Sequence, residues 1–323
     1  MRSDVVGFAK QTQKGTGVYT AEYFVPVESA DASPNSELLE ITETLGKRFP
    51  SDPPDRGSSQ WEVTASGAVR PGALPRMLSS FMGAPTSVST SGAFQHTFDM
   101  YAADTALVLH SILVGRADPT PKITDWAYDC YGASMEISVA PNDYMKFNGT
   151  WNGRSANTSQ TFPASPTSDA TPKYPYYQVL AYITVNTATE TVVTLGEATI
   201  TITNEIDLDY LALGAQDPYD IGVGNGNVEV SFTPLQNLDV WLRRGYPGNV
   251  DDIKLRLVAT GSVIGTTAYT VEFTCYRGRV TETSAPVNAG EILKGVPVTL
   301  QFAKDKTLAK FLDARVINTV ASY

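Results

Sequence analysis

The residue types that most often carry out catalysis or bind metals are scarce in this chain. It contains two histidines, His96 and His110, and two cysteines, Cys130 and Cys275. Each histidine lies in a strand-like run without a cysteine or carboxylate at the spacing of zinc ligands, which favours a structural role over a metal site. The cysteines also lie in strand-like runs, so two buried thiols are predicted.

The motifs of common enzyme classes do not occur in the sequence. There is no GxSxG, P-loop or HExxH motif. The glycine-rich run GVGNGN at 222–227 lacks the GxGxxG spacing and precedes a strand instead of a helix, so it is interpreted as a turn. The sequence therefore predicts a protein that is not an enzyme and that uses no cofactor or metal.

One acidic group is the best candidate for a cation site. Its carboxylates supply the oxygen ligands that calcium prefers, but their spacing is not that of a regular calcium loop, which favours a solvated loop. The group consists of Glu205, Asp207, Asp209, Asp217 and Asp220. A carboxylate pair for glycoside hydrolysis stays open, because the separation that defines such a pair is spatial. A glycoside hydrolase is the least favoured function.

A strand followed by a short amphipathic helix is the clearest structural pattern. Residues 61–69 alternate apolar and polar side chains as a half-buried strand does, and Pro71 ends the run. Apolar side chains then recur at helical spacing up to Gly83, a residue type that suits the end of a helix. The helical stripe consists of Leu74, Met77, Leu78, Phe81 and Met82.

A shorter version of this pattern returns in the second half of the chain. A strand with Val228 and Val230 leads into Pro234, which lies 163 positions (234 − 71) after the first proline in a chain of 323 residues. The stripe that follows ends at Gly245 and consists of Leu235, Leu238, Trp241 and Leu242. The spacing predicts that each half of the chain forms one similar unit.

Strand-like runs dominate both halves and predict a mainly β protein. We expect two tandem antiparallel β-barrel or sandwich units, each with one flanking α-helix, together with an extended N-terminal arm and long loops. The predicted division is an arm at 1–54, a first unit at 55–152, a linker at 153–175 and a second unit at 176–323. The linker is rich in Ser, Thr, Asn and Pro and has no apolar period.

Composition limits the classes of partner. Charged residues make up 18% of the chain, with 34 acidic against 24 basic residues and no basic run. Sequence-independent binding to the phosphate backbone of a nucleic acid is therefore not expected. The first ten residues lack the apolar core of a signal peptide, and no apolar run has membrane-spanning length, so we expect folding in a cytoplasm without a membrane.

Several segments, taken in their order along the chain, carry a resemblance to a known family. They are VGFAKQTQKGTG, WEVTASGAVRPGALPRMLSSFMGAP followed by GAFQHTF, ITITNEIDLDYLALG and RVINTVASY. Together they resemble tail tube (major tail) proteins of long-tailed, siphovirus-type bacteriophages. The resemblance implies a β-barrel flanked by a helix and assembled in rings, which stack into a tube around a tape-measure protein and later conduct DNA. It implies no catalytic residue.

The resemblance also implies packing positions and partners. By position, the resemblance assigns inter-ring contact to the arm at 1–54. It assigns helix packing to Leu74, Leu78, Phe81, Leu238, Trp241 and Leu242. The implied partners are further copies of the chain, the tape-measure protein, tail terminator and tail-tip proteins, and DNA that passes through the lumen without sequence specificity. The implied location is the virion tail, with assembly in the host cytoplasm.

Two units in one chain change the expected symmetry of a ring. Three chains would supply six units, which predicts a trimeric ring with pseudo-six-fold shape. A six-chain ring decorated by the second half is the competing arrangement.

A carbohydrate-binding or adhesin-like β-sandwich protein is the alternative function. Aromatic side chains would be its stacking platforms, although core and edge packing explains most of them equally well. These aromatics are Trp126, Tyr128, Tyr131, Tyr174, Tyr176 and Tyr177.

Overall fold

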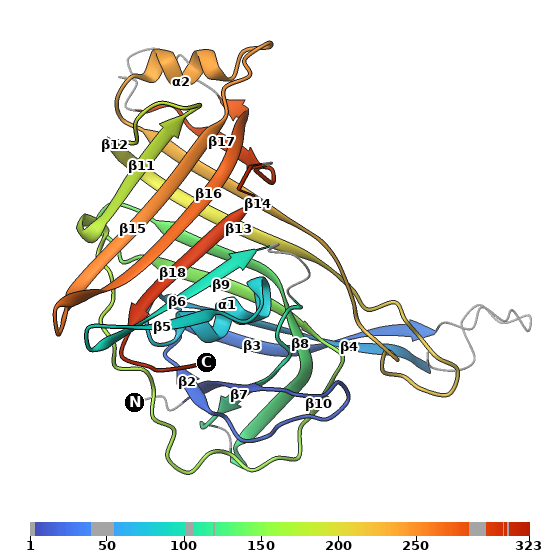
Figure 1. Cartoon of the computed structure of the whole chain (residues 1–323). Helices are drawn as coiled ribbons and strands as arrows, with labels where there is room; N and C mark the ends of the chain where they lie inside the picture. The colour runs from blue at the N-terminus through green and yellow to red at the C-terminus, as the bar shows by residue number, and fades with distance from the viewer. Residues whose placement is uncertain are drawn as a thin grey trace, which may run out of the picture.

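The computed structural model describes residues 4–39, 55–100, 106–118, 120–283, 295–305, 307–308 and 310–323. Within these residues the chain is mainly β, as predicted, with one antiparallel sheet of 18 strands and two α-helices (Figure 1). The first half contains β1 (Val5–Lys10), β2 (Tyr23–Val25), β3 (Ser29–Leu39), β4 (Asp55–Ala68), α1 (Leu74–Met82), β5 (Thr86–Thr90), β6 (Ala93–Met100), β7 (His110–Arg116), β8 (Ile123–Val139), β9 (Lys146–Gly153) and β10 (Ser155–Asn157). The second half contains the 3-10 helix η1 (Tyr176–Gln178), β11 (Val179–Val185), β12 (Thr191–Val193), β13 (Leu195–Asp207), β14 (Gly222–Pro234), α2 (Leu238–Arg244), β15 (Ile253–Ile264), β16 (Thr267–Thr283), β17 (Val298–Phe302) and β18 (Leu312–Asn318).

The sheet is not closed into a barrel. One edge of β16 pairs with β15, and its other edge pairs with β18 over 270–275 and with β17 over 278–283, so the sheet branches there. One branch continues through β18 and β6 to β5, and the other continues through β17, β14, β13, β8, β9 and β4 to β3. The prediction of closed barrels is wrong, because the two branches end without pairing to each other in the described residues.

Strands from the two halves of the sequence pair directly. β8 pairs with β13 through residues 134–139, and β6 pairs with β18 through residues 94–100. The largest core cluster also contains buried side chains from both halves, such as Phe81 and Phe232. Inside the predicted linker, β10 pairs with β8. The division at 153–175 stays a prediction, and the tandem repeat of two units is not confirmed.

Most of the predicted arm that the structure describes belongs to the sheet. β1 pairs with β7 and β2, and its Val6 and Phe8 side chains are buried in the main core. β3 pairs with β4 and is largely exposed. Residues 1–3 and 40–54 of the predicted arm lie outside the described residues.

The glycine-rich run at 222–227 begins β14, so its interpretation as a turn is wrong. Asn227 and Gly226 pair with Thr203 and Asn204 of β13, and Gly222 pairs with Asp207. A strand can include several glycines where a neighbouring strand supplies its hydrogen-bonding partners, although each glycine weakens it. The turn between β13 and β14 is the loop 208–221.

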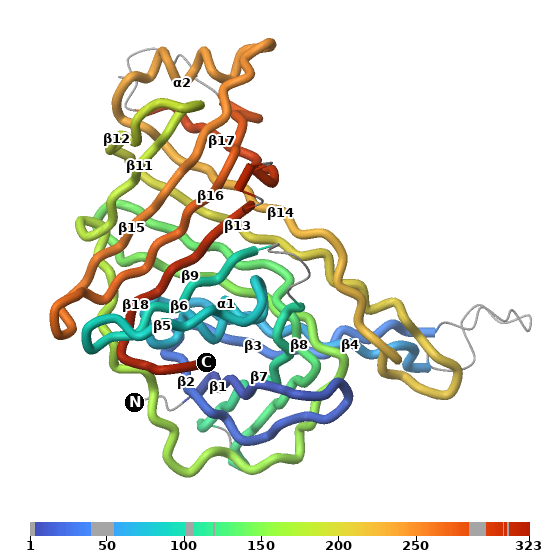
Figure 2. Tube along the Cα trace, in the orientation of Figure 1, coloured from blue at the N-terminus to red at the C-terminus, as the bar shows by residue number. Residues whose placement is uncertain are grey.

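Helix α1 forms where the apolar stripe predicts it and is buried in the core. Leu74, Leu78 and Phe81 are fully buried. Phe81 lies against Gly132 of β8, where a Cβ would approach its ring to 2.5 Å. Gly83 ends the helix with φ 87°, a conformation that favours glycine. The position of α1 in front of β8 and β9 is visible in Figure 2.

Helix α2 is shorter and lies at one end of the sheet (Figure 1). Trp241 is 3% exposed and packs edge-on against Phe232, with ring centroids 5.2 Å apart. Leu238 and Leu242 are half-buried, and Leu235 precedes the helix and is exposed. The order of strand, proline, helix and glycine is therefore repeated, whereas the burial of the helix is not.

Truncation of one leucine in each helix measures this difference. Leu78→Ala is expected to lower the free energy of unfolding by about 2–5 kcal/mol, because it leaves a cavity in the core. Leu242→Ala is the matched change at a half-buried position and is expected to cost less than about 2 kcal/mol. Urea unfolding of both purified variants gives the two values, and equal losses would contradict the unequal packing of the helices.

Candidate assembly surfaces

The histidines and cysteines are buried, and His110 of β7 is the cross-strand partner of Cys130 of β8. His96 Nε2 donates to the Val320 carbonyl (2.9 Å), and His110 Nδ1 donates to the Val108 carbonyl (3.0 Å). Burial lowers the pKa of His110 to about 4 and raises the pKa of both Cys130 and Cys275, so the uncharged forms are favoured. Within the described ranges, no three His, Cys, Asp or Glu side chains are placed to hold a metal ion.

The acidic residues considered as calcium ligands have separate local partners. Asp220 pairs with Lys14 (Oδ1 to Nζ, 2.6 Å), and Asp207 accepts a hydrogen bond from the Asp209 backbone N–H (2.9 Å). Glu205 accepts a long hydrogen bond from the Asn225 N–H (3.4 Å). These side chains stabilise the two ends of the loop 208–221 and do not converge on one point.

Half of the aromatic residues considered as sugar platforms are buried. Trp126, Tyr131 and Tyr174 are almost inaccessible to solvent, so they cannot stack on a bound glycan. Tyr128 is half-buried beneath the guanidinium of Arg154. The exposed residues are Tyr176 and Tyr177, whose rings meet edge-on with centroids 5.7 Å apart. These two remaining rings do not form a flat stacking surface.

Several strands have a free edge. Among the described residues, β3, β5 and β12 each pair with one neighbour, namely β4, β6 and β11. The outer N–H and C=O groups of such strands can pair with a strand from another chain. β3 provides the longest of these three edges, with eleven residues. Sequence patterns did not identify these edges, because strand order depends on pairing between distant segments.

A projection extends from the body of the protein (Figures 1 and 2). We define it as the outer parts of β3 and β4 together with the ends of β13 and β14 and the loop 208–221. Backbone and side-chain hydrogen bonds join its two parts: the Ser59 N–H donates to the Gln216 carbonyl (2.9 Å), and Gln216 Nε2 donates to the Arg56 carbonyl (3.3 Å). The two hairpins therefore support each other.

The base of the loop 208–221 is anchored to the body. Leu208 and Ile221 are buried against Tyr131 of β8. Lys14, in the turn after β1, pairs with Asp220 and also donates to the Ile221 carbonyl (3.3 Å). The direction in which the loop extends is therefore set by contacts with β8 and with the N-terminal turn.

A buried carboxylate holds the N-terminal turn in place. Asp129 of β8 is 1% exposed and has φ 54°. It accepts hydrogen bonds from the Gly15 N–H (2.8 Å) and from Gln11 Nε2 (2.9 Å), and it forms an ion pair with Arg154 (2.8 Å). The carboxylate is thereby paired and hydrogen-bonded, as a buried charge must be. No sequence pattern indicated this group, because Gln11 and Gly15 lie more than a hundred positions away from Asp129 and Arg154 follows β9.

The outer part of the loop 208–221 presents apolar side chains to solvent. Tyr210 and Leu211 are about half exposed, and Leu213 is fully exposed. The run from Tyr210 to Ala215 contains no charged residue. We call residues 210–215 the apex. Apolar side chains that gather at an exposed site are typical of a contact with another molecule.

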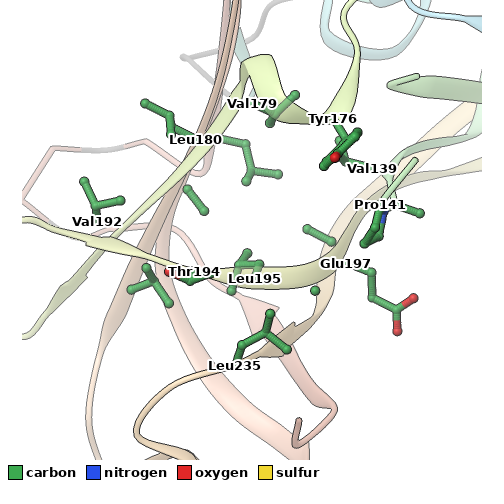
Figure 3. Close-up of a pocket in the computed structure, with 16 residues that line it drawn as sticks. Val139, Pro141, Tyr176, Val179, Leu180, Val192, Thr194, Leu195, Glu197 and Leu235 are labelled. Carbon is green, nitrogen blue, oxygen red and sulfur yellow. The ribbon is translucent and has the colours of Figure 1, made fainter. Parts of the chain in front are cut away.

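An apolar groove of about 400 Å³ lies between β11, β12 and β13 (Figure 3). Its walls include Val179, Leu180, Val192 and Leu195, and Leu235 closes one side. Glu197 is its one charged lining residue, and Figure 3 shows the carboxylate turned away from the apolar side chains. The groove has the size of a small-ligand pocket but lacks the convergent polar groups that orient a substrate.

The six residues predicted to pack the helices are distributed unevenly. Leu74, Leu78 and Phe81 lie in the main core, and Trp241 is buried at the end of the sheet. Leu238 and Leu242 are half-buried. All six lie away from the groove lining and the apex, so they support the fold that positions these surfaces.

A family model described as phage tail tube protein matches residues 3–302. No curated protein matches the chain. In the part of the chain that the structure describes, no helix is long and apolar enough to cross a membrane.

The two ion pairs beneath the projection are expected to differ in strength. Asp129→Asn removes the charge that compensates Arg154 while keeping a side chain that tolerates positive φ, and it is expected to cost about 3 kcal/mol of unfolding free energy. Lys14→Ala breaks an exposed pair and is expected to cost less than about 1 kcal/mol. Chemical denaturation measures both losses. A Lys14→Ala loss equal to that of Asp129→Asn would show that the buried carboxylate is not the main anchor.

Proposed function

Because the chain belongs to the phage tail tube protein family, we propose that copies of it assemble into rings that stack as the tube of a phage tail. The family match makes the chain a structural tail protein. The observation that carries the finer proposal is the open sheet, whose free edges and projection are suited to contacts between copies.

The free edges support sheet pairing between copies. A strand edge that stays exposed invites uncontrolled association, and a closed ring of subunits removes this hazard by pairing each edge with a neighbour. β3, β5 and β12 are the candidate edges. Lateral pairing of this kind would make one continuous sheet around the lumen of the tube.

Three chains in each ring is the symmetry that we propose. Each chain supplies two elements with the order strand, proline, helix and glycine, so three chains supply six. The ring would be trimeric with pseudo-six-fold shape. The alternative is a ring of six chains. Because α2 is less buried than α1, the region around α2 would then lie outside the tube.

The proposed partners follow from a tube that transmits DNA. They are the tape-measure protein in the lumen during assembly, terminator and tail-tip proteins at the ends, and DNA in transit. The net charge of −10 would keep contact with DNA weak, because few cations are available to hold phosphates. We place the protein in the virion tail after assembly in the host cytoplasm, and the proposed role involves no catalytic step and no cofactor.

Mass measurement of single rings tests this proposal. Purified chain, concentrated until rings or tubes appear in negative-stain electron micrographs, is expected to give rings of about 104 kDa (3 × 34.8 kDa). Rings of about 209 kDa (6 × 34.8 kDa) would replace the trimeric ring by the six-chain arrangement. A chain that remains monomeric at every concentration would contradict ring assembly itself.

A further inference from the structure

We propose that the apex of one copy, residues 210–215, inserts into the apolar groove of a neighbouring copy. The inference rests on the proposed assembly and adds the pair of surfaces that would form one of its contacts. It commits to a second copy of this chain as the occupant of the groove.

The apex is exposed to solvent and is not buried within its own chain. Its base is held by Leu208, Ile221 and Lys14, so the loop cannot easily fold back onto the body. Its side chains nevertheless include Leu211 and Leu213, both more than half exposed. Burial of such a leucine in an apolar site removes apolar area from water. A contact that covers the apex would therefore be favourable.

The groove matches the apex in size and in charge. Its volume of about 400 Å³ lies in the range that accepts a small ligand, and it is sufficient for one or two large apolar side chains. Leu180, Val192 and Leu235 in its lining are each more than 40% exposed. Neither the apex nor the inward-facing groove lining in Figure 3 presents a charged group that insertion would bury without a partner.

The positions of the two surfaces favour a second copy over an internal contact. The groove lies beside β11 and β12, whereas the apex lies beyond the outer ends of β13 and β14, on the opposite side of the molecule (Figure 1). A chain cannot fill its own groove across this separation. Two different surfaces on opposite sides form a head-to-tail interface, which generates a ring when the rotation between copies closes.

Insertion of the apex is compatible with strand pairing elsewhere on the chain. Insertion of the apex would bury apolar area on both partners and would leave the edges of β3 and β5 available for lateral pairing. The groove and apex therefore supply a contact that is separate from strand pairing.

Two pairs of polar substitutions test the contact. Leu211→Ser with Leu213→Ser in the apex, and separately Leu180→Ser with Val192→Ser in the groove, are expected to lower the assembled fraction at least tenfold in sedimentation. These side chains are about half exposed or more, so the monomer should unfold in urea as the parent chain does. Val263→Ser is the matched control, since Val263 is 73% exposed near the end of β15 and lies in neither surface. It is expected to assemble like the parent chain.

Disulfide crosslinking identifies the occupant directly. A chain with Leu213→Cys and Val192→Cys is expected to form a ladder of covalent oligomers when assembled material is oxidised, because each contact joins two copies. A chain with Leu213→Cys and Val263→Cys should form no ladder. The natural Cys130 and Cys275 are fully buried and do not compete.

The outcomes separate this inference from the proposed function. If rings form, the Leu213→Cys with Val192→Cys chain gives no ladder and the serine variants assemble normally, the apex contact is wrong and the tube proposal stands. A defect in the groove variant alone, without a ladder, would indicate another occupant, such as a different tail protein or an apolar ligand, and would also overturn the contact. Failure of the parent chain to assemble would overturn both.

Discussion

The packing of helix α1 on strand β8 is the contact on which the rest of the structure depends. The Phe81 ring occupies the space that a side chain at Gly132 would need, so helix and strand approach closely only because β8 has glycine there. Asn204 of β13 donates hydrogen bonds to the carbonyls of Phe81 (3.1 Å) and Gly132 (3.0 Å). These contacts satisfy buried polar groups and fasten a strand of the second half to the helix of the first. Trp151 adds a hydrogen bond from Nε1 to Ser80 Oγ (2.8 Å).

The packing of α1, β8 and β13 belongs to the core, and the surfaces proposed for assembly lie outside this contact. The buried histidines and cysteines belong to the core, and the same strand β8 carries Asp129, which positions the N-terminal turn and through it the loop 208–221. Contacts of β8 therefore connect the region of α1 with the projection. In the described residues, the candidate assembly surfaces are the outer edges of β3, β5 and β12, the apex and the groove. None of them contributes to the main packing of α1. Stability within a chain and contact between chains therefore use largely separate residues.

The sequence predicted what depends on local pattern and missed what depends on distant pairing. Helix α1 was predictable because Leu74, Leu78 and Phe81 follow helical spacing between a proline and a glycine. The spacing of α2 was similar, but its burial depends on which strands lie beneath it, and only Trp241 is buried. The run at 222–227 was misinterpreted because its pairing with β13 outweighs the weak strand preference of glycine. The pairing of β6 with β18, the open branches of the sheet, the groove and the buried Asp129 all depend on contacts that no local pattern encodes.

We propose that the core is complete in the free chain, whereas the strand edges gain their partners only when copies assemble. Amide hydrogen exchange of the free chain and of assembled rings, followed peptide by peptide, measures this difference. We expect β3, β5, β12 and the loop 208–221 to gain protection on assembly, and α1 to be equally protected in both states. Equal protection of these edges and of the loop before and after assembly would contradict it.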